Sequence, residues 1–286
     1  MNSRATSAEH KGCVLNAGVD PALGFANRQG TPETDPSVPI IAGHSHCSCL
    51  GVPLGTRDGL SRLVMLENGD GRFCGFSGSW PRIPSFWEDL AEAARGRTVI
   101  LVWQGNQHMA EFILAPGQAF DFVLFEDQDL ALDPHAEVVP DLAIQERFAE
   151  SIVGLDEVIP RLYQHGAVRV IVSGTPAPRG SMEVVRKGVL AEKFFAGVAE
   201  HLGLRLEDIP ISTPLFMHKL WRVVQRLTRE AAVRQAAEFL PVPDITLQDG
   251  FLRPEFGGVA DITHANAAYG QVTLDHFQSY LTRKSP

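Results

Sequence analysis

The sequence predicts an α/β protein in which a mainly parallel sheet is covered by helices on both faces. Short apolar runs that include Val and Ile occur at residues 38–42, 98–103 and 168–173, and such runs are typical of strands buried on both sides. Helical patterns lie between and after these runs. Glycine or polar residues follow each run, and in a parallel sheet the segments that leave the carboxyl ends of the strands hold the functional site.

In the first part of the chain we expect a strand followed by an irregular segment. The strand at 38–42 runs into a tight turn at Gly43, and the Pro and Gly residues of 52–62 leave room only for a short helix. Residues 63–66 form a second apolar run. The small residues placed among the aromatics of 73–80 predict a loop that another part of the protein approaches closely.

A helix is expected over 85–95, because Ser85 can cap it, Glu88 follows three residues later and the pattern stops at a glycine. Residues 120–125 alternate and predict a further strand. The remaining elements are expected at 142–165 (helix), 168–173 (strand), 183–202 and 215–240 (helices), 244–247 (a short final strand or loop) and 265–281 (closing helix).

Composition excludes several classes of protein. The chain of 286 residues has a net charge of −9 and lacks a basic block, so we expect neither nucleic acid nor an anionic membrane as a partner. It has no apolar run of the roughly 18 residues that span a bilayer, and its first residues do not resemble a signal peptide. The four cysteines do not suggest a disulfide framework. We therefore expect a cytoplasmic protein, with residues 1–36 forming a flexible arm and 37–286 forming the domain.

Two short segments at opposite ends of the domain carry the candidate chemistry. Ser45 stands at the tip of the turn that follows the first strand, where a hydroxyl is presented to a substrate. Asp261 and His264 lie just before the closing helix, one turn apart. A serine needs a base to take its proton, an imidazole can do this near neutral pH, and a carboxylate can orient the imidazole. We expect the two ends to meet.

Several other side chains suit simpler explanations. The segment from His44 to Cys49, together with His108, does not have the ligand spacing of a zinc site, so we expect no metal. Arg179 and Lys187 are expected at the solvated surface, with contact to an anionic substrate as the alternative. Trp80 and Phe76 are expected to be packing residues, with lining of the site as the alternative.

The motifs resemble those of the SGNH (GDSL-like) hydrolase family, whose members are esterases and acyl transferases with a flavodoxin-like three-layer α/β/α sandwich. Residues 43–45 are similar to the first motif of that family, and residues 104–106 are similar to the third. Residues 261–264, followed by Asn266 and Gly270, are similar to the last. His44 replaces the usual aspartate of the first motif, and Gln107 replaces the aspartate that usually follows the asparagine of the third.

The resemblance implies an acyl hydrolase in which Ser45 is the nucleophile, His264 the base and Asp261 its orienting carboxylate. The oxyanion hole would consist of the Ser45 and Gly78 N–H groups and the Asn106 amide; Gly75 is the alternative to Gly78. Two further assignments complete the comparison: His44 and His108 are candidates for substrate binding, and residues 115–165 and 205–245 are expected to be insertions that form a lid or substrate wall.

The expected substrate is a carboxylic or O-acetyl ester of a small molecule or glycan, and no cofactor is required. Two alternatives remain open: an O-acyltransferase that uses the same acyl-enzyme, and a catalytically degenerate protein of this fold that binds carbohydrate or a partner. A flavodoxin-like nucleotide binder is disfavoured, because no glycine-rich phosphate loop follows the first strand.

Overall fold

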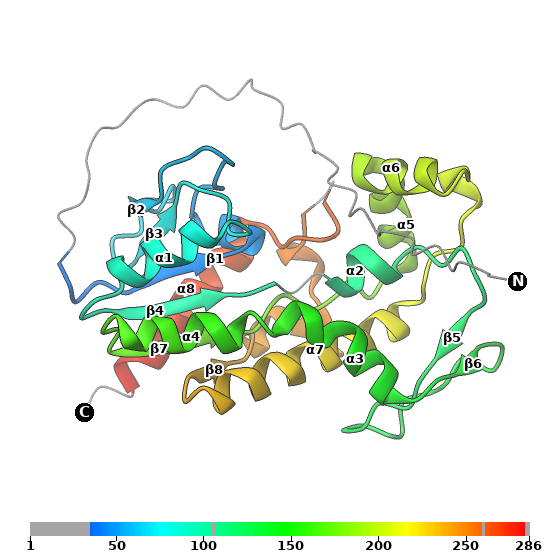
Figure 1. Ribbon diagram of the computed structural model, residues 1–286. Helices are drawn as coiled ribbons and strands as arrows, with labels where there is room; N and C mark the ends of the chain where they lie inside the picture. The colour runs from blue at the N-terminus through cyan, green and yellow to red at the C-terminus, as the bar shows by residue number, and fades with distance from the viewer. Residues whose placement is uncertain (1–34, 105–106, 259–260, 284–286) are drawn as a thin grey trace, which may run out of the picture.

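A six-stranded sheet forms the centre of the protein in the computed structural model, which describes residues 35–104, 107–258 and 261–283 (Figure 1). Its strands are β1 (Ile40–Gly43), β2 (Arg62–Met65), β3 (Cys74–Ser77), β4 (Thr98–Val102), β7 (Arg169–Ser173) and β8 (Glu238–Leu240). Their order is β2-β3-β1-β4-β7-β8, and the pairings are parallel except that of β2 with β3. Counted along the chain, the five mutually parallel strands therefore lie in the order 2-1-3-4-5.

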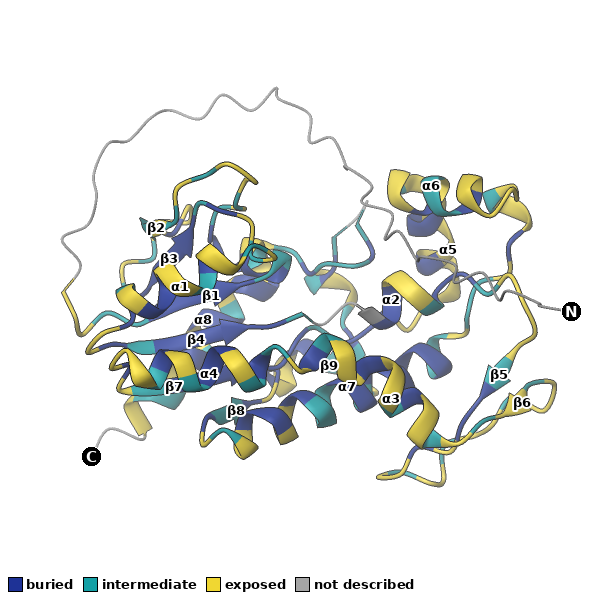
Figure 2. Ribbon diagram, viewed as in Figure 1, coloured by how far each residue is buried: buried dark blue, intermediate teal, exposed yellow. Residues whose placement is uncertain are grey.

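Helices cover both faces of this sheet, as the sequence predicted. Alternate strand residues face opposite sides, so Leu101 of β4 packs with α1 (Pro84–Ala93), α4 (Leu155–Gln164) and the end of α7 (Pro214–Arg234). Val102 packs on the other side, against α8 (Ala267–Arg283) and the 3-10 helix η1 (Ser45–Leu50). The central strands are buried along their length (Figure 2) because they have a hydrophobic layer above and below.

A second hydrophobic core lies beside the sheet. It joins α2 (Gln107–Phe112), α3 (Asp141–Ile152), α5 (Met182–Ala191) and α6 (Lys193–His201) to the first half of α7. A small parallel pair, β5 (Phe120–Asp121) and β6 (Glu137–Val138), is fastened to α7 by the buried ion pair of Lys219 with Asp121, whose Nζ–Oδ2 distance is 2.9 Å. Of the two expected insertions, α4 and the end of α7 belong to the layer on the sheet, whereas much of the rest forms this second core.

The segment before α8 is short and irregular. Its elements are η3 (Asp244–Thr246), β9 (Leu247–Gln248), β10 (Phe251–Leu252) and η4 (Pro254–Phe256). The 3-10 helix η2 (Leu206–Asp208) lies earlier in the chain, between α6 and α7. Among the residues that the structure describes, no helix has the length and apolar character needed to cross a membrane.

Several predicted elements differ in the structure. The expected loop at 73–80 contains the buried strand β3, which pairs with β1 on one side and β2 on the other. Helix α1 begins at Pro84 with Ile83 in the N-cap position, so the predicted Ser85 cap is wrong; the fixed φ of proline suits the first helical position. Only the first two residues of the strand expected at 120–125 belong to a strand.

Three predicted helices were too long. The one expected over 183–202 divides into α5 and α6 at Glu192, whose backbone is extended. The pattern over 142–165 divides into α3 and α4 at Gly154, where a Cβ would lie 2.8 Å from the Trp103 ring. The pattern over 215–240 ends at Arg234, and its last residues form β8, the final parallel strand of the sheet. Ala236, which has a positive φ of 57°, separates the helix from the strand. Residues 244–247, expected as a short final strand or a loop, form η3 and the first residue of β9, outside the main sheet.

Candidate active site

Ser45 lies at the carboxyl end of β1, on the turn that the sequence predicted. Gly43 ends the strand with φ of 145°, and a Cβ there would lie 2.0 Å from the Val102 carbonyl oxygen, so the turn requires glycine. The His44 N–H donates to the same oxygen over 3.0 Å. Ser45 then begins η1 and is partly exposed. The strand ends β1 and β4 thus fix the position of the hydroxyl.

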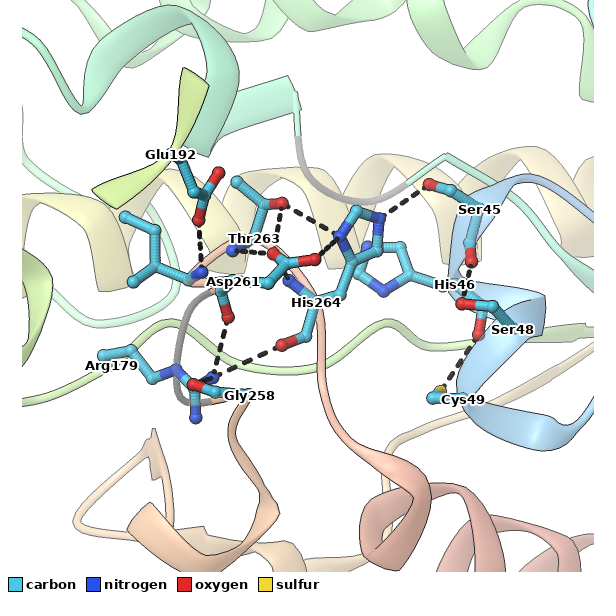
Figure 3. Close-up of polar contacts among 11 residues, drawn as sticks. Ser45, His46, Ser48, Cys49, Arg179, Glu192, Gly258, Asp261, Thr263 and His264 are labelled. Atoms are coloured by element: carbon cyan, nitrogen blue, oxygen red, sulfur yellow. Dashed lines mark hydrogen bonds and ion pairs between the residues drawn. The ribbon is translucent and has the colours of Figure 1, made fainter. Parts of the chain in front are cut away.

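The structure brings this hydroxyl to the imidazole of His264, 219 residues away along the chain. The distance from Ser45 Oγ to His264 Nε2 is 2.8 Å, and that from His264 Nδ1 to Asp261 Oδ2 is also 2.8 Å (Figure 3). The imidazole is mostly shielded, with 24% of its side-chain surface exposed, whereas that of Asp261 is 49% exposed. The three side chains therefore form a continuous hydrogen-bonded series from carboxylate to hydroxyl.

Asp261 is held by its own loop. Its Oδ1 accepts from the Thr263 N–H, the Thr263 hydroxyl and the His264 N–H at 2.8–3.0 Å. Burial alone would raise the pKa of this carboxyl, but the hydrogen bond and charge of His264 and the two hydrogen bonds of Thr263 hold the pKa well below its usual range. Asp261 is therefore ionised at neutral pH, with one oxygen fixed by the loop and the other on the imidazole.

Helix α8 starts just after His264, and Asn266 fixes that start. The Asn266 Oδ1 accepts from the N–H groups of Ala268 and Tyr269, and its Nδ2 donates to the carbonyls of Glu255 and Gly257. The asparagine thus caps the helix and joins it to the preceding segment. Because α8 packs against η1, the cap sets the approach of His264 to Ser45.

Arg179 supports the loop of Asp261 and His264 from beneath. The sequence suggested a solvated side chain, but Arg179 is buried, and its Nη2 donates to the carbonyl oxygens of Gly258, Asp261 and His264 over 3.3, 3.4 and 3.3 Å (Figure 3). Burial lowers the pKa of its guanidinium somewhat. Lys187, in contrast, is exposed as expected.

Glu192 holds the same loop from the opposite side, a role that no motif in the sequence indicated. Its Oε1 accepts from the Ile262 N–H (Figure 3). Glu192 lies between α5 and α6, and Gly188 of α5 is so near Ile262 that a Cβ there would lie 1.8 Å from the Ile262 Cγ2. Burial, assisted by the charge of Asp261, raises the Glu192 pKa to about 6.

The two histidines on either side of Ser45 in the sequence lie beside the site without joining the hydrogen-bonded series. His44 packs against the rings of Trp87 and Trp103, at centroid distances of 5.8 and 5.0 Å. His46 is buried with its ring 4.8 Å from that of His264. Burial lowers the pKa of His44 to about 4 and that of His46 to about 3, so both are neutral at pH 7 and add no charge beside the base.

His108 is also buried, on α2, and lines a small cavity together with His46 and His264. Within the described ranges, histidine, cysteine and acidic side chains do not gather in groups of three or more that could hold a metal ion.

The structure describes only some of the expected oxyanion donors. Asn106 lies outside the described residues. Gly78 follows β3 with φ of 139°, and its carbonyl accepts from the Thr56 N–H over 2.8 Å; a Cβ at Gly78 would lie 1.9 Å from the Leu60 carbonyl oxygen. Gly75, the alternative, lies within β3 and pairs with β1 and β2. Of the two glycines, Gly78 is the one at the carboxyl end of its strand, as Ser45 is.

The sequence was compared with known families and proteins. No family model matches it, and no curated protein matches it either.

Proposed function

We propose that the protein is a serine-dependent acyl hydrolase that cleaves carboxylic or O-acetyl esters through an acyl-enzyme on Ser45. One observation carries the proposal: the Oγ of Ser45 and the Oδ2 of Asp261 each lie 2.8 Å from a ring nitrogen of the same imidazole, His264. A nucleophile in contact with a base, and a base in contact with an orienting carboxylate, is the arrangement by which serine is activated on several unrelated folds.

The sheet supports the resemblance to SGNH hydrolases. The order 2-1-3-4-5 of its parallel strands is that of flavodoxin-like sheets, and such sheets bind ligands outside the carboxyl ends of their strands where the strand order reverses. Ser45 occupies this place, beside the ends of β1 and β4. We therefore assign the chain a flavodoxin-like, SGNH-type sandwich.

The reaction follows from the positions of the three side chains. The Ser45 oxygen forms a bond to the ester carbonyl carbon as its proton passes to Nε2 of His264. The bond to the alcohol oxygen then breaks, and His264 gives its proton to that oxygen. Water then attacks the acyl-enzyme in the same way: it gives a proton to His264 as its oxygen bonds to the acyl carbon. The bond to Ser45 breaks, the serine takes that proton back, and the carboxylic acid is released. Asp261 stays ionised and stabilises the imidazolium.

The tetrahedral intermediate carries a negative charge on the former carbonyl oxygen, and hydrogen-bond donors must stabilise it. We assign this role to the backbone N–H groups of Ser45 and Gly78 and to the Asn106 amide, as the resemblance implies. Loss of one such donor typically lowers the turnover by about 10²–10³, so Asn106→Ala is expected to retain the fold and lose activity on that scale.

Active-site labelling tests the proposal. A fluorophosphonate probe should label the wild-type protein covalently and should not label Ser45→Ala. Ser279→Ala is the matched control, because Ser279 is an exposed serine near the C-terminal end of α8 and should leave labelling intact. Absence of labelling in folded wild-type protein, or equal labelling of Ser45→Ala, would disprove the proposed hydrolase activity of Ser45.

A further inference from the structure

A cavity of about 160 Å³ opens next to Ser45 and is not used by the three residues of the proposed mechanism. Ser45 forms part of its wall, and the buried apolar side chains of Val52, Phe76 and Phe86 line it together with polar residues that include Ser77, Ser79 and Arg82. Phe76 was expected to be a packing residue, with lining of the site as the alternative; it belongs to the core and also lines the space beside the hydroxyl.

Neither Asp261 nor His264, both described, lines the cavity. Its walls come from residues 43–47, from residues 52–55, from the end of β3 and the segment after it, and from Phe86 and Gln104. In the proposed reaction the departing alcohol oxygen takes its proton from His264, so the alcohol part must lie against His264. The cavity, which His264 does not line, is left for the acyl part.

Two large apolar side chains stand at the rim of the cavity and are strongly exposed. Leu54 is 56% exposed and Trp80 is 46% exposed. Trp80 was expected to be a packing residue, so this assignment was wrong. Exposed apolar groups around a concave site are typical of surfaces that contact a ligand.

This rim is fixed to the sheet rather than loosely attached. The Ser77 hydroxyl donates to the Pro53 carbonyl over 2.5 Å, and the Thr56 N–H donates to the Gly78 carbonyl over 2.8 Å. The segment that carries Leu54 is thus bound to the end of β3 on both sides of that leucine. A cavity with such a rim keeps its shape and can select its ligand by size.

Resting on the proposed function, we propose that this cavity is the acyl-binding site and that it selects apolar acyl groups of medium length. Its volume sets the length, because an apolar cavity of roughly 150 Å³ accommodates a benzene molecule, with its six carbon atoms. Butanoyl and hexanoyl esters should fill the site, acetyl esters should leave part of it empty, and dodecanoyl esters should exceed it.

The first measurement varies the acyl chain while the leaving group stays constant. Steady-state kinetics on p-nitrophenyl acetate, butanoate, hexanoate, octanoate and dodecanoate should show kcat/KM rising by about threefold to fourfold per added methylene until the cavity is filled. It should then fall at least tenfold by dodecanoate. A parallel series of acetates with alcohols of increasing length should show no such maximum.

The second measurement obstructs the rim. Leu54→Trp should lower kcat/KM for the hexanoate at least tenfold relative to the acetate and shift the optimum to shorter chains. Leu142→Trp is the matched control, since Leu142 is 61% exposed on α3 and does not line the cavity. It should reproduce the wild-type profile. Fluorophosphonate titration gives the concentration of active serine for each protein.

Three results would overturn the proposal. The cavity would take the leaving group if Leu54→Trp altered the dependence on alcohol length instead of acyl length. It would have no role in selection if this variant matched the wild type in both series, or if dodecanoate were the best substrate of the wild type. Wild-type protein that the fluorophosphonate does not label would overturn the proposed function itself, and labelling therefore separates the two failures.

Discussion

Gly270 of α8 lies directly against the carbonyl oxygen of Cys49 in η1: a Cβ on Gly270 would be 1.6 Å from that oxygen. The helix that follows His264 therefore touches the backbone of the segment that begins with Ser45. Because both catalytic candidates lie within a few residues of this contact, the glycine sets how closely the two ends of the domain approach.

Gly270→Ala should weaken both the fold and the site. Alanine favours a helix by about 1 kcal/mol over glycine, but its methyl group cannot be placed without moving α8 away from η1, and such overpacking costs about 1–3 kcal/mol. We expect a lower free energy of unfolding in urea and a turnover at least tenfold lower, because the Ser45–His264 distance grows. Gln271→Ala, at the exposed next position, should change neither. Full activity in Gly270→Ala would mean that the contact does not set this distance.

The local sequence pattern was sufficient to predict the strands that are continuous apolar runs. The strand before Ser45 and the strands at 98–103 and 168–173 are apolar runs, and the structure has β1, β4 and β7 there. It failed at β3, whose small residues favour a loop; pairing with strands on both sides makes this segment a strand. It failed again at β8, which is three residues long and continues the pattern of the helix before it.

The same limit applies to the site. Asp261 and His264 belong to one short motif, and the segment that holds Ser45 has a recognisable glycine turn. Arg179 and Glu192 contact the loop of Asp261 and His264 from 70 or more positions away, and only the folded chain brings them there. No spacing rule links a carboxylate to a backbone N–H at such a separation.

Arg179 should act as a positioning residue, through the loop that carries Asp261 and His264. Arg179→Met removes the donors to three carbonyl oxygens and should lower kcat by about tenfold to a hundredfold, since small misplacements of a catalytic group have effects of that size. KM should change little. Arg179→Lys, which keeps one donor group, should recover part of the loss. Arg186→Met, at an exposed position of α5, is the control, and unchanged kcat in folded Arg179→Met would contradict the role.

Glu192 should make stability depend on pH. Burial raises its pKa to about 6 from an ordinary 4.5, so the folded protein holds this proton more tightly than the unfolded chain does. Its ionisation therefore reduces stability as the pH rises from 4.5 through 6. Glu192→Gln keeps an acceptor for the Ile262 N–H and does not ionise.

The Tm of Glu192→Gln minus that of the wild type should therefore be more positive at pH 7.5 than at pH 4.5. Glu183→Gln, an exposed change on α5, supplies the reference. A Tm difference between Glu192→Gln and wild type that is equal at both pH values would show that the Glu192 charge does not affect folding.

His44 should have the opposite dependence. Burial lowers its pKa to about 4, with a contribution from Arg82, so the unfolded chain takes up a proton near pH 6.5 while the folded protein does not. Stability is therefore lost as the pH falls from 6.5 towards 4. His44→Phe fills the space beside Trp87 and Trp103 and does not titrate. Between pH 7.5 and pH 5 its free energy of unfolding should fall by about 1–2 kcal/mol less than that of the wild type. Urea unfolding at both pH values measures this, and a loss equal to that of wild type would contradict it.

Asp261→Asn separates the structural role of this side chain from its chemical one. The amide oxygen can still accept from the Thr263 N–H, the Thr263 hydroxyl and the His264 N–H, which now hold Oδ1, so the loop should keep its shape and the Tm should change little. The amide nitrogen, however, would place a donor against Nδ1 of His264. The imidazole would then carry its proton on Nε2, facing Ser45, where it cannot accept the serine proton.

We therefore expect kcat to fall by about 10³–10⁴ in Asp261→Asn, with slower labelling by the fluorophosphonate and a Tm close to that of wild type. Thr263→Val is the matched comparison, because it removes two hydrogen bonds of the same loop but leaves the carboxylate on the imidazole; it should lower the Tm more than it lowers kcat. If Asp261→Asn kept kcat within tenfold of wild type, the carboxylate would serve the loop alone, and the 2.8 Å contact with Nδ1 would have no part in activating Ser45.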